Sequence, residues 1–73
     1  MKVMIQEVPT RRYYRSTGVW TNDVAQASDF RTSTAALAAI SKSKLRNVQL
    51  VATRNLKDFE VFPLRQTLVA QPG

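Results

Sequence analysis

The chain has 73 residues and a basic balance, with 11 Lys and Arg against 5 Asp and Glu and a formal net charge of +6 at pH 7. It contains neither Cys nor His, which excludes a disulfide framework, a thiolate metal site and catalysis by imidazole. This length fits one small domain with a thin margin of stability, and the positive charge either favours anionic partners or only keeps the chain in solution.

The first part of the chain has the period-two pattern of β-strands. Residues Lys2–Val8 alternate apolar side chains between two faces, and Pro9 ends or bends this strand. The aromatic segment Arg11–Arg15 predicts a second extended piece. A turn at Gly18, which can take a positive φ, then allows Val19–Thr21 to pair back as a short third strand.

The segment before the central helix has a different pattern. Asn22–Ala27 contains a variant capping box and predicts one helical turn that buries Ala27. Phe30 lies next to the position where an apolar residue staples the start of a helix, so we expect Phe30 to anchor the core.

One long helix is predicted over Ser33–Ser43. The segment is rich in Ala, contains no Pro or Gly, and can be capped by Thr32 or the residue after it. Ala36, Leu37 and Ile40 share one face at helical spacing. We expect this face to pack on a sheet through Leu37 and Ile40.

The last third of the chain predicts a strand pair. Asn47–Thr53 alternates between two faces, Asn55–Asp58 supplies turn residues, and Phe59–Leu64 returns as a strand. Residues 66–73 have no clear pattern and predict a mobile tail after a single domain over 1–65. The fold class is therefore α+β, a mostly antiparallel sheet with one main helix on one face in the order β-β-(β)-α-β-β.

The sequence also resembles a set of small uncharacterised bacterial proteins. In those proteins an aromatic strand, a Gly-x-Trp-Thr-x-Asp segment, an Ala-x-x-Phe step and a helix precede a final strand pair. The matching residues here are Tyr14, Gly18, Trp20, Thr21, Asp23, Ala27, Phe30 and the run Val48–Val51. The resemblance implies the same order of elements and a bacterial origin, and it implies no activity.

The chain shows no pattern for catalysis. None of its five carboxylates forms a close pair on a predicted shared face, and neither glycine lies in a phosphate-binding loop. We therefore predict that the protein is not an enzyme and has no catalytic residue, metal site, cofactor or small-molecule substrate. No apolar run is long enough for a membrane span and no signal peptide precedes the first strand, so no membrane association is expected and a cytoplasmic location is.

One candidate surface combines positive charge with aromatic rings. Arg11, Arg12 and Arg15 can contact phosphates, and Tyr13 can stack on a base, which is how sheet surfaces bind single-stranded nucleic acid. The alternative is that one tyrosine of this segment lies in the core and the arginines protect the edge of a sheet.

A second candidate surface is apolar. A single helix covers only one face of the sheet, which would leave Val51, Phe62 or Met4 in an exposed apolar patch, with Val51 and Phe62 as the candidates for self-association. Our favoured hypothesis is a small bacterial accessory or regulatory protein that acts through a protein partner or as a homodimer. The alternative is a basic module that binds single-stranded nucleic acid.

Overall fold

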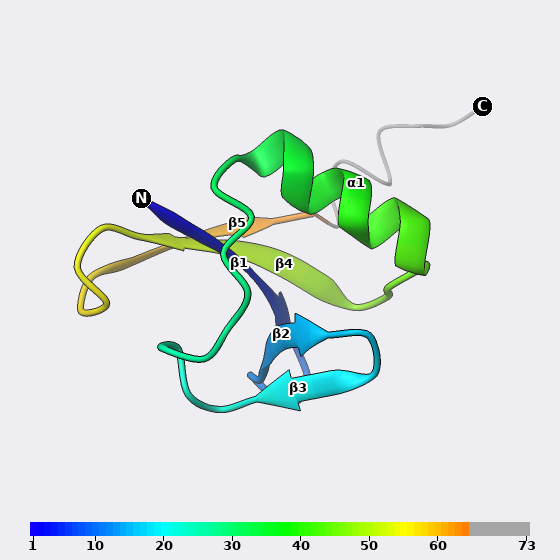
Figure 1. Cartoon of the computed structure of the whole chain (residues 1–73), viewed down its shortest axis with the longest axis horizontal. Helices are drawn as coiled ribbons and strands as arrows, with labels where there is room; N and C mark the ends of the chain where they lie inside the picture. The colour runs from blue at the N-terminus through cyan, green and yellow to red at the C-terminus, as the bar shows by residue number, and fades with distance from the viewer. Residues whose placement is uncertain (65–73) are drawn as a thin grey trace.

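The computed structural model describes residues 1–64 and has the predicted α+β architecture (Figure 1). The predicted tail over 66–73 and the last residue of the predicted domain lie outside the described residues. The elements are β1 (Lys2–Glu7), β2 (Tyr13–Ser16), β3 (Val19–Thr21), α1 (Ser33–Ser43), β4 (Val48–Thr53) and β5 (Phe59–Pro63).

The strands form one five-stranded antiparallel sheet in the order β3-β2-β1-β4-β5, and α1 lies on one of its faces (Figure 1). β1 and β4 form the centre of the sheet, where Val3 pairs with Ala52 and Ile5 pairs with Leu50. These side chains point toward the helix because paired residues share a face. The core under the helix consists of Val3, Ile5, Tyr14, Ala36, Leu50 and Ala52.

The chain between β3 and α1 fills a gap in the sheet. β1 and β2 pair only at Gln6 and Tyr13, after which the two strands diverge. The backbone N–H of Ser28 donates to the Tyr14 carbonyl at 2.9 Å, and that of Phe30 donates to the Val3 carbonyl at 2.9 Å. These bonds satisfy strand edges that would otherwise be unpaired.

The same connection covers part of the face opposite the helix. Its turn at residues 23–27 packs Val24 and Ala27 against Met4 and Val51, and the Lys2 ammonium donates to the Val24 carbonyl at 2.6 Å. Met4 is fully buried and Val51 is 1% exposed. The predictions that Val51 and Met4 lie on an exposed surface are therefore wrong, because the turn at residues 23–27, which buries Ala27 as predicted, lies over them.

The helix has the predicted ends, and of the three residues predicted for its packed face, Ala36 and Ile40 contact the core and Leu37 does not. Thr32 caps it by accepting from the Ala35 N–H at 3.1 Å. Ala36 is fully buried and Ile40 packs beside the core, whereas Leu37 is 43% exposed. The predicted packing through Leu37 is wrong, because the small side chain of Ala36 sits nearest the sheet and Leu37 lies to its side.

The residue that ends the helix has a left-handed conformation. Lys44 has φ 54° and ψ 42°, and its N–H bonds back to the Ile40 and Ser41 carbonyls. This conformation costs an L-residue about 1 to 2 kcal/mol, while Gly adopts it freely. We expect Lys44→Gly to raise the free energy of unfolding by about 0.5 to 1 kcal/mol, since part of the gain is offset by the greater freedom of Gly in the unfolded chain.

The control for this prediction is Lys42→Gly in the last turn of the helix. That position has ordinary helical geometry, so Gly there should cost about 1 kcal/mol. Urea unfolding of both variants measures the two values. Equal losses of stability in both would contradict the role assigned to the left-handed residue.

Candidate functional site

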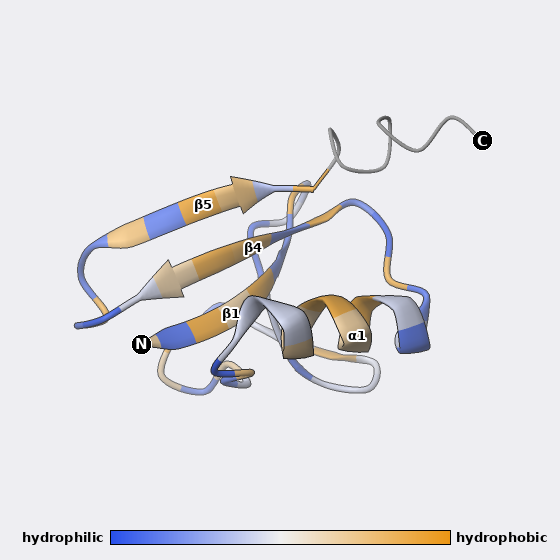
Figure 2. Cartoon of the chain, turned by 90° about the horizontal axis from the view of Figure 1, so that it is seen from above, coloured by the Kyte–Doolittle hydropathy of each residue, from blue (hydrophilic) through white to orange (hydrophobic). Residues whose placement is uncertain are grey.

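The candidate functional site is the outer strand β5, because its side chains are exposed. All five of its residues are exposed. Phe59 is 40%, Val61 50% and Phe62 47% exposed. Figure 2 shows β5 as the outermost strand, on the side of β4 away from β1 and the helix. The predicted candidate Phe62 thus lies on this strand, and Phe59 and Val61 join it.

The sheet places the exposed side chains of β5 on both faces. Phe62 pairs with Leu50, so Phe62 lies on the helix side. Val61 pairs with the buried Val51, and Phe59 lies on the same opposite face two residues away. The outer strand therefore exposes apolar side chains on both faces, with Glu60 as its one charged residue on the helix side, and exposed apolar edge strands are sites for pairing with another chain.

The backbone of β4 shows which groups of β5 point outward. The Val8 N–H donates to the Asn47 carbonyl at 2.8 Å, in continuation of the pairing between β1 and β4. Residues along a strand direct their backbone groups alternately to the two sides. Leu50 and Ala52 lie an odd number of residues after Asn47. Their backbone groups therefore point to the opposite side of β4, toward β5.

It follows that alternate residues of β5 have backbone groups that no other strand within residues 1–64 pairs with. Phe62 pairs with Leu50 and Glu60 with Ala52, so the backbones of Phe62 and Glu60 bond to β4. Phe59, Val61 and Pro63 direct theirs away from the sheet. Pro63 has no N–H. Because its backbone groups point away from β4, the pairing between β4 and β5 loses no hydrogen bond.

The arginine segment predicted as a nucleic-acid surface is only partly in a strand. Tyr13 and Arg15 belong to β2, whereas Arg11 lies in the preceding turn with φ 63° and Arg12 follows it. The three arginines are exposed. Tyr13 is half-buried and packs beside Met4, so its ring is not a free stacking surface.

The other aromatic rings near this segment serve the core. Tyr14 is buried and meets Trp20 edge-to-face, with ring centroids 5.6 Å apart. Phe30 lies on the other side, with its centroid 5.9 Å from that of Tyr14. Phe30 therefore anchors the core as predicted. Tyr14 is therefore inaccessible to a base, while Trp20 and Phe30 are half-buried against it.

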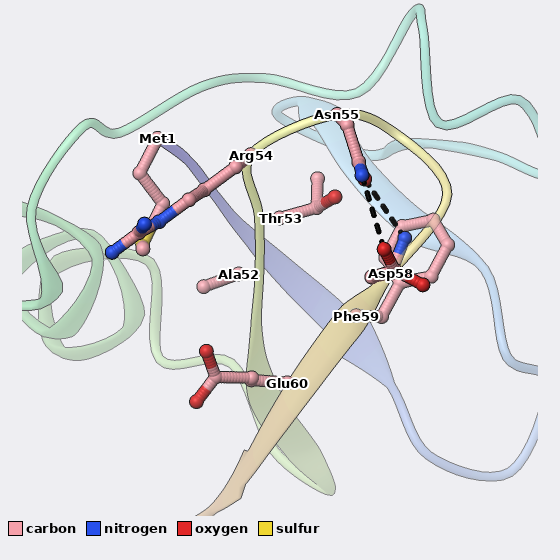
Figure 3. Close-up of a pocket in the computed structure, with 8 residues that line it drawn as sticks. All are labelled: Met1, Ala52, Thr53, Arg54, Asn55, Asp58, Phe59 and Glu60. Atoms are coloured by element: carbon pink, nitrogen blue, oxygen red, sulfur yellow. Dashed lines mark hydrogen bonds between the residues drawn. The ribbon is translucent and has the colours of Figure 1, made fainter.

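The hollow drawn in Figure 3 lies at the turn of the β4–β5 hairpin, next to Met1. Its volume of about 160 Å³ is below the roughly 300 Å³ at which small-molecule sites begin. The Asn55 amide donates to the Asp58 carboxylate at 3.0 Å and accepts from the Asp58 N–H at 2.9 Å. Both polar groups therefore hold the turn, which leaves Arg54 and Glu60 as the charged groups of the hollow.

A wider apolar groove runs between α1 and the start of β4. Leu37, Ile40, Leu45 and Val48 line it, and it ends at Leu64. The chain continues from Leu64 into residues 65–73, outside the described part. We therefore assign no site to this groove.

Asp29 fixes the connection that fills the gap in the sheet. Its carboxylate accepts from the Val3 N–H at 3.1 Å and from the Arg31 N–H at 2.8 Å. Burial raises the pKa of Asp29, but the hydrogen bonds and the charges of Arg31 and Lys2 lower it more, and the net pKa lies below its ordinary value.

The lowered pKa of Asp29 gives a stability term with a defined pH range. The carboxylate stabilises the folded chain fully above the unfolded pKa of about 4, and this contribution is lost as the pH falls through the lower folded pKa. We expect Asp29→Ala to cost about 1 kcal/mol at neutral pH through the lost hydrogen bonds. In urea titrations, the difference in free energy of unfolding between Asp29→Ala and the wild type should shrink below pH 4. A difference that stays the same at all pH values would contradict a stabilising role of the ionised Asp29 carboxylate.

Within residues 1–64 no cluster of acidic side chains is arranged to hold a metal ion. No helix among the described elements has the length and apolar character needed to cross a membrane. Comparisons with known proteins find no matching family model, no matching curated protein and no matching solved structure.

Proposed function

We propose that this protein is a small bacterial accessory or regulatory protein that acts in the cytoplasm through protein–protein contact, with the outer strand β5 as its contact edge. The observation that carries the proposal is the exposure of Phe59, Val61 and Phe62 on a strand with outward-facing backbone groups. A partner strand can bond to this backbone and cover the apolar side chains.

The other outer strand makes a useful comparison. β3 has only three residues, and its pairing with β2 is interrupted by an irregularity between Tyr14 and Ser16. Short and irregular edges discourage pairing with another chain. β5 is longer and regular, so it is the edge that favours a partner.

A photo-crosslinking residue at position 61 tests the proposal. Val61→p-benzoylphenylalanine should capture a protein in extract of the source cells, because this side chain is 50% exposed on β5. The matched control is the same residue at Val19, which is 42% exposed on β3. We expect at least several-fold more crosslinked protein at position 61, where another copy of the chain counts as a partner. Equal or absent crosslinking at the two positions would overturn the proposal.

Binding of single-stranded nucleic acid is the second candidate function, and the exposed side chains of Arg11, Arg12 and Arg15 favour it. Three phosphate contacts predict that log K falls with log salt at a slope of roughly −2. The packing of Tyr14 and Trp20 against each other argues against it, because it leaves less ring surface on which a base could stack. Fluorescence titration of a labelled oligonucleotide at rising salt, with Arg12→Ala against Lys57→Ala, distinguishes a site from general attraction.

A further inference from the structure

We propose that the partner of β5 is a second copy of this chain, whose own β5 pairs with it antiparallel about a two-fold axis at Val61. This inference rests on the proposed function, since it names the partner of the same edge. A two-fold contact between identical edges is closed, so association stops at a dimer. The short, irregular edge strand β3 remains at each end of the joined sheet.

The outward-facing backbone groups determine the register. Phe59, Val61 and Pro63 must lie opposite residues of this same set in the second copy. With the axis at Val61, the two Val61 residues exchange N–H···O bonds, and each Phe59 N–H donates to the Pro63 carbonyl of the other copy. Every outward N–H of the strand then has an acceptor, and the missing N–H of Pro63 falls at the ends of the junction.

The two neighbouring registers are less favourable. An axis at Glu60 places its carboxylate directly opposite its counterpart, in the closer kind of antiparallel pair, and like charges there repel. An axis at Phe62 places Val61 opposite Pro63, where the Val61 carbonyl receives no hydrogen bond. The axis at Val61 keeps the carboxylates apart, and the carbonyl that then faces Pro63 is that of Phe59 at the end of the junction, so the central Val61 pair keeps both of its hydrogen bonds.

The same register also matches the side chains. On the face opposite the helix, Val61 meets its counterpart and Phe59 lies against Pro63 of the other copy, because directly opposed residues share a face. On the helix face, Glu60 lies opposite Phe62, so no carboxylate faces another. Val61 is thereby covered by its own equivalent, Phe59 by Pro63, and Phe62 by the side chain of Glu60 of the other copy.

Charge and size set the expected strength of the dimer. Each copy carries +6, so the copies repel at long range and added salt should strengthen the dimer. A contact built on one five-residue strand buries less than the ~800 Å² per partner of a standard interface. We therefore expect a weak, concentration-dependent dimer whose response to salt is opposite to that of nucleic-acid binding.

Sedimentation equilibrium of the full chain at several salt concentrations tests the dimer. The wild type should dimerise with rising concentration, and more readily at higher salt. Val61→Lys should weaken the dimer at least ten-fold with the circular dichroism spectrum unchanged, whereas Val19→Lys on β3 should leave it unchanged. A wild type that stays monomeric at near-millimolar concentration and high salt, or equal effects of the two variants, would overturn the second copy as partner.

Single cysteines test the register, because the chain has no cysteine of its own. With the axis at Val61, the Cα atoms of the two Val61 residues are about 5.5 Å apart, within the range that a disulfide spans. Val61→Cys should therefore form a disulfide dimer on mild oxidation at least several-fold faster than Glu60→Cys or Phe62→Cys. Faster linkage through either of the latter would overturn the Val61 axis.

The failures of this inference and of the proposed function can be told apart. If the chain is monomeric by sedimentation but position 61 captures a different protein, then the partner of β5 is not a second copy, and β5 remains the proposed contact edge. If position 61 captures nothing above the Val19 control, the contact edge itself is wrong.

Discussion

Replacing Ile5 by alanine should lower the free energy of unfolding by about 3 to 4 kcal/mol. Ile5 is fully buried at the centre of β1, paired with Leu50 and covered by the helix. For a chain of 73 residues the whole stability is roughly 4 to 11 kcal/mol. The variant should therefore be partly or largely unfolded at room temperature in a urea or thermal titration.

Ile5→Val is the matched control, since it removes one methylene from the same site. We expect it to cost about 1 kcal/mol and to leave the chain folded. If Ile5→Ala cost no more than Ile5→Val, the centre of the core would not lie between β1, β4 and the helix.

The second large effect is expected at Val51. Val51→Ser should cost about 3 kcal/mol, because it leaves a cavity and places a hydroxyl among apolar side chains of the face opposite the helix. Phe62→Ser removes a much larger side chain, but that side chain is half-exposed on the outer strand. We expect Phe62→Ser to cost less than about 1 kcal/mol in the monomer.

Urea unfolding of the two serine variants at low protein concentration measures this difference. A larger loss for Phe62→Ser than for Val51→Ser would reverse the assignment of core and surface. It would also remove the basis for a contact edge at β5.

The secondary structure was predictable because its signals are local. The helix begins at Ser33 and ends at Ser43 as expected, since a hydroxyl cap and an alanine-rich run lie next to each other in the sequence. The strands β1 and β4 followed from alternation of apolar residues. The paired registers confirm which of their side chains share a face.

The errors arose where packing depends on distant segments. The alternation of β4 places Val51 on the face opposite the helix, which was expected to be uncovered. The turn at residues 23–27 lies across that face. Leu37 shares a helical face with Ala36, yet the buried alanine permits close approach and leaves the leucine beside the contact. Neither arrangement can be derived from the period of the local sequence.

The candidate contact edge was only partly predictable. Phe62 was named from its alternation, but Phe59 and Val61 were not, because strand order decides which strand is outermost. Pro63 was the available signal, since a proline at the end of a strand favours an edge. The side chains of Arg11, Arg12 and Arg15 are exposed, and the fold was needed to decide that Tyr14 is the tyrosine of this segment that lies in the core, beside Trp20.

Residue-resolved amide exchange at increasing protein concentration tests the role of β5 most directly. The N–H groups of Phe59 and Val61 point outward, so they should exchange fast in dilute solution and slow markedly as the protein is concentrated. The amides of Glu60 and Phe62 bond to β4 and should change much less. If Phe59 and Val61 exchange at the same rate from dilute to near-millimolar solution, β5 does not pair with a second copy.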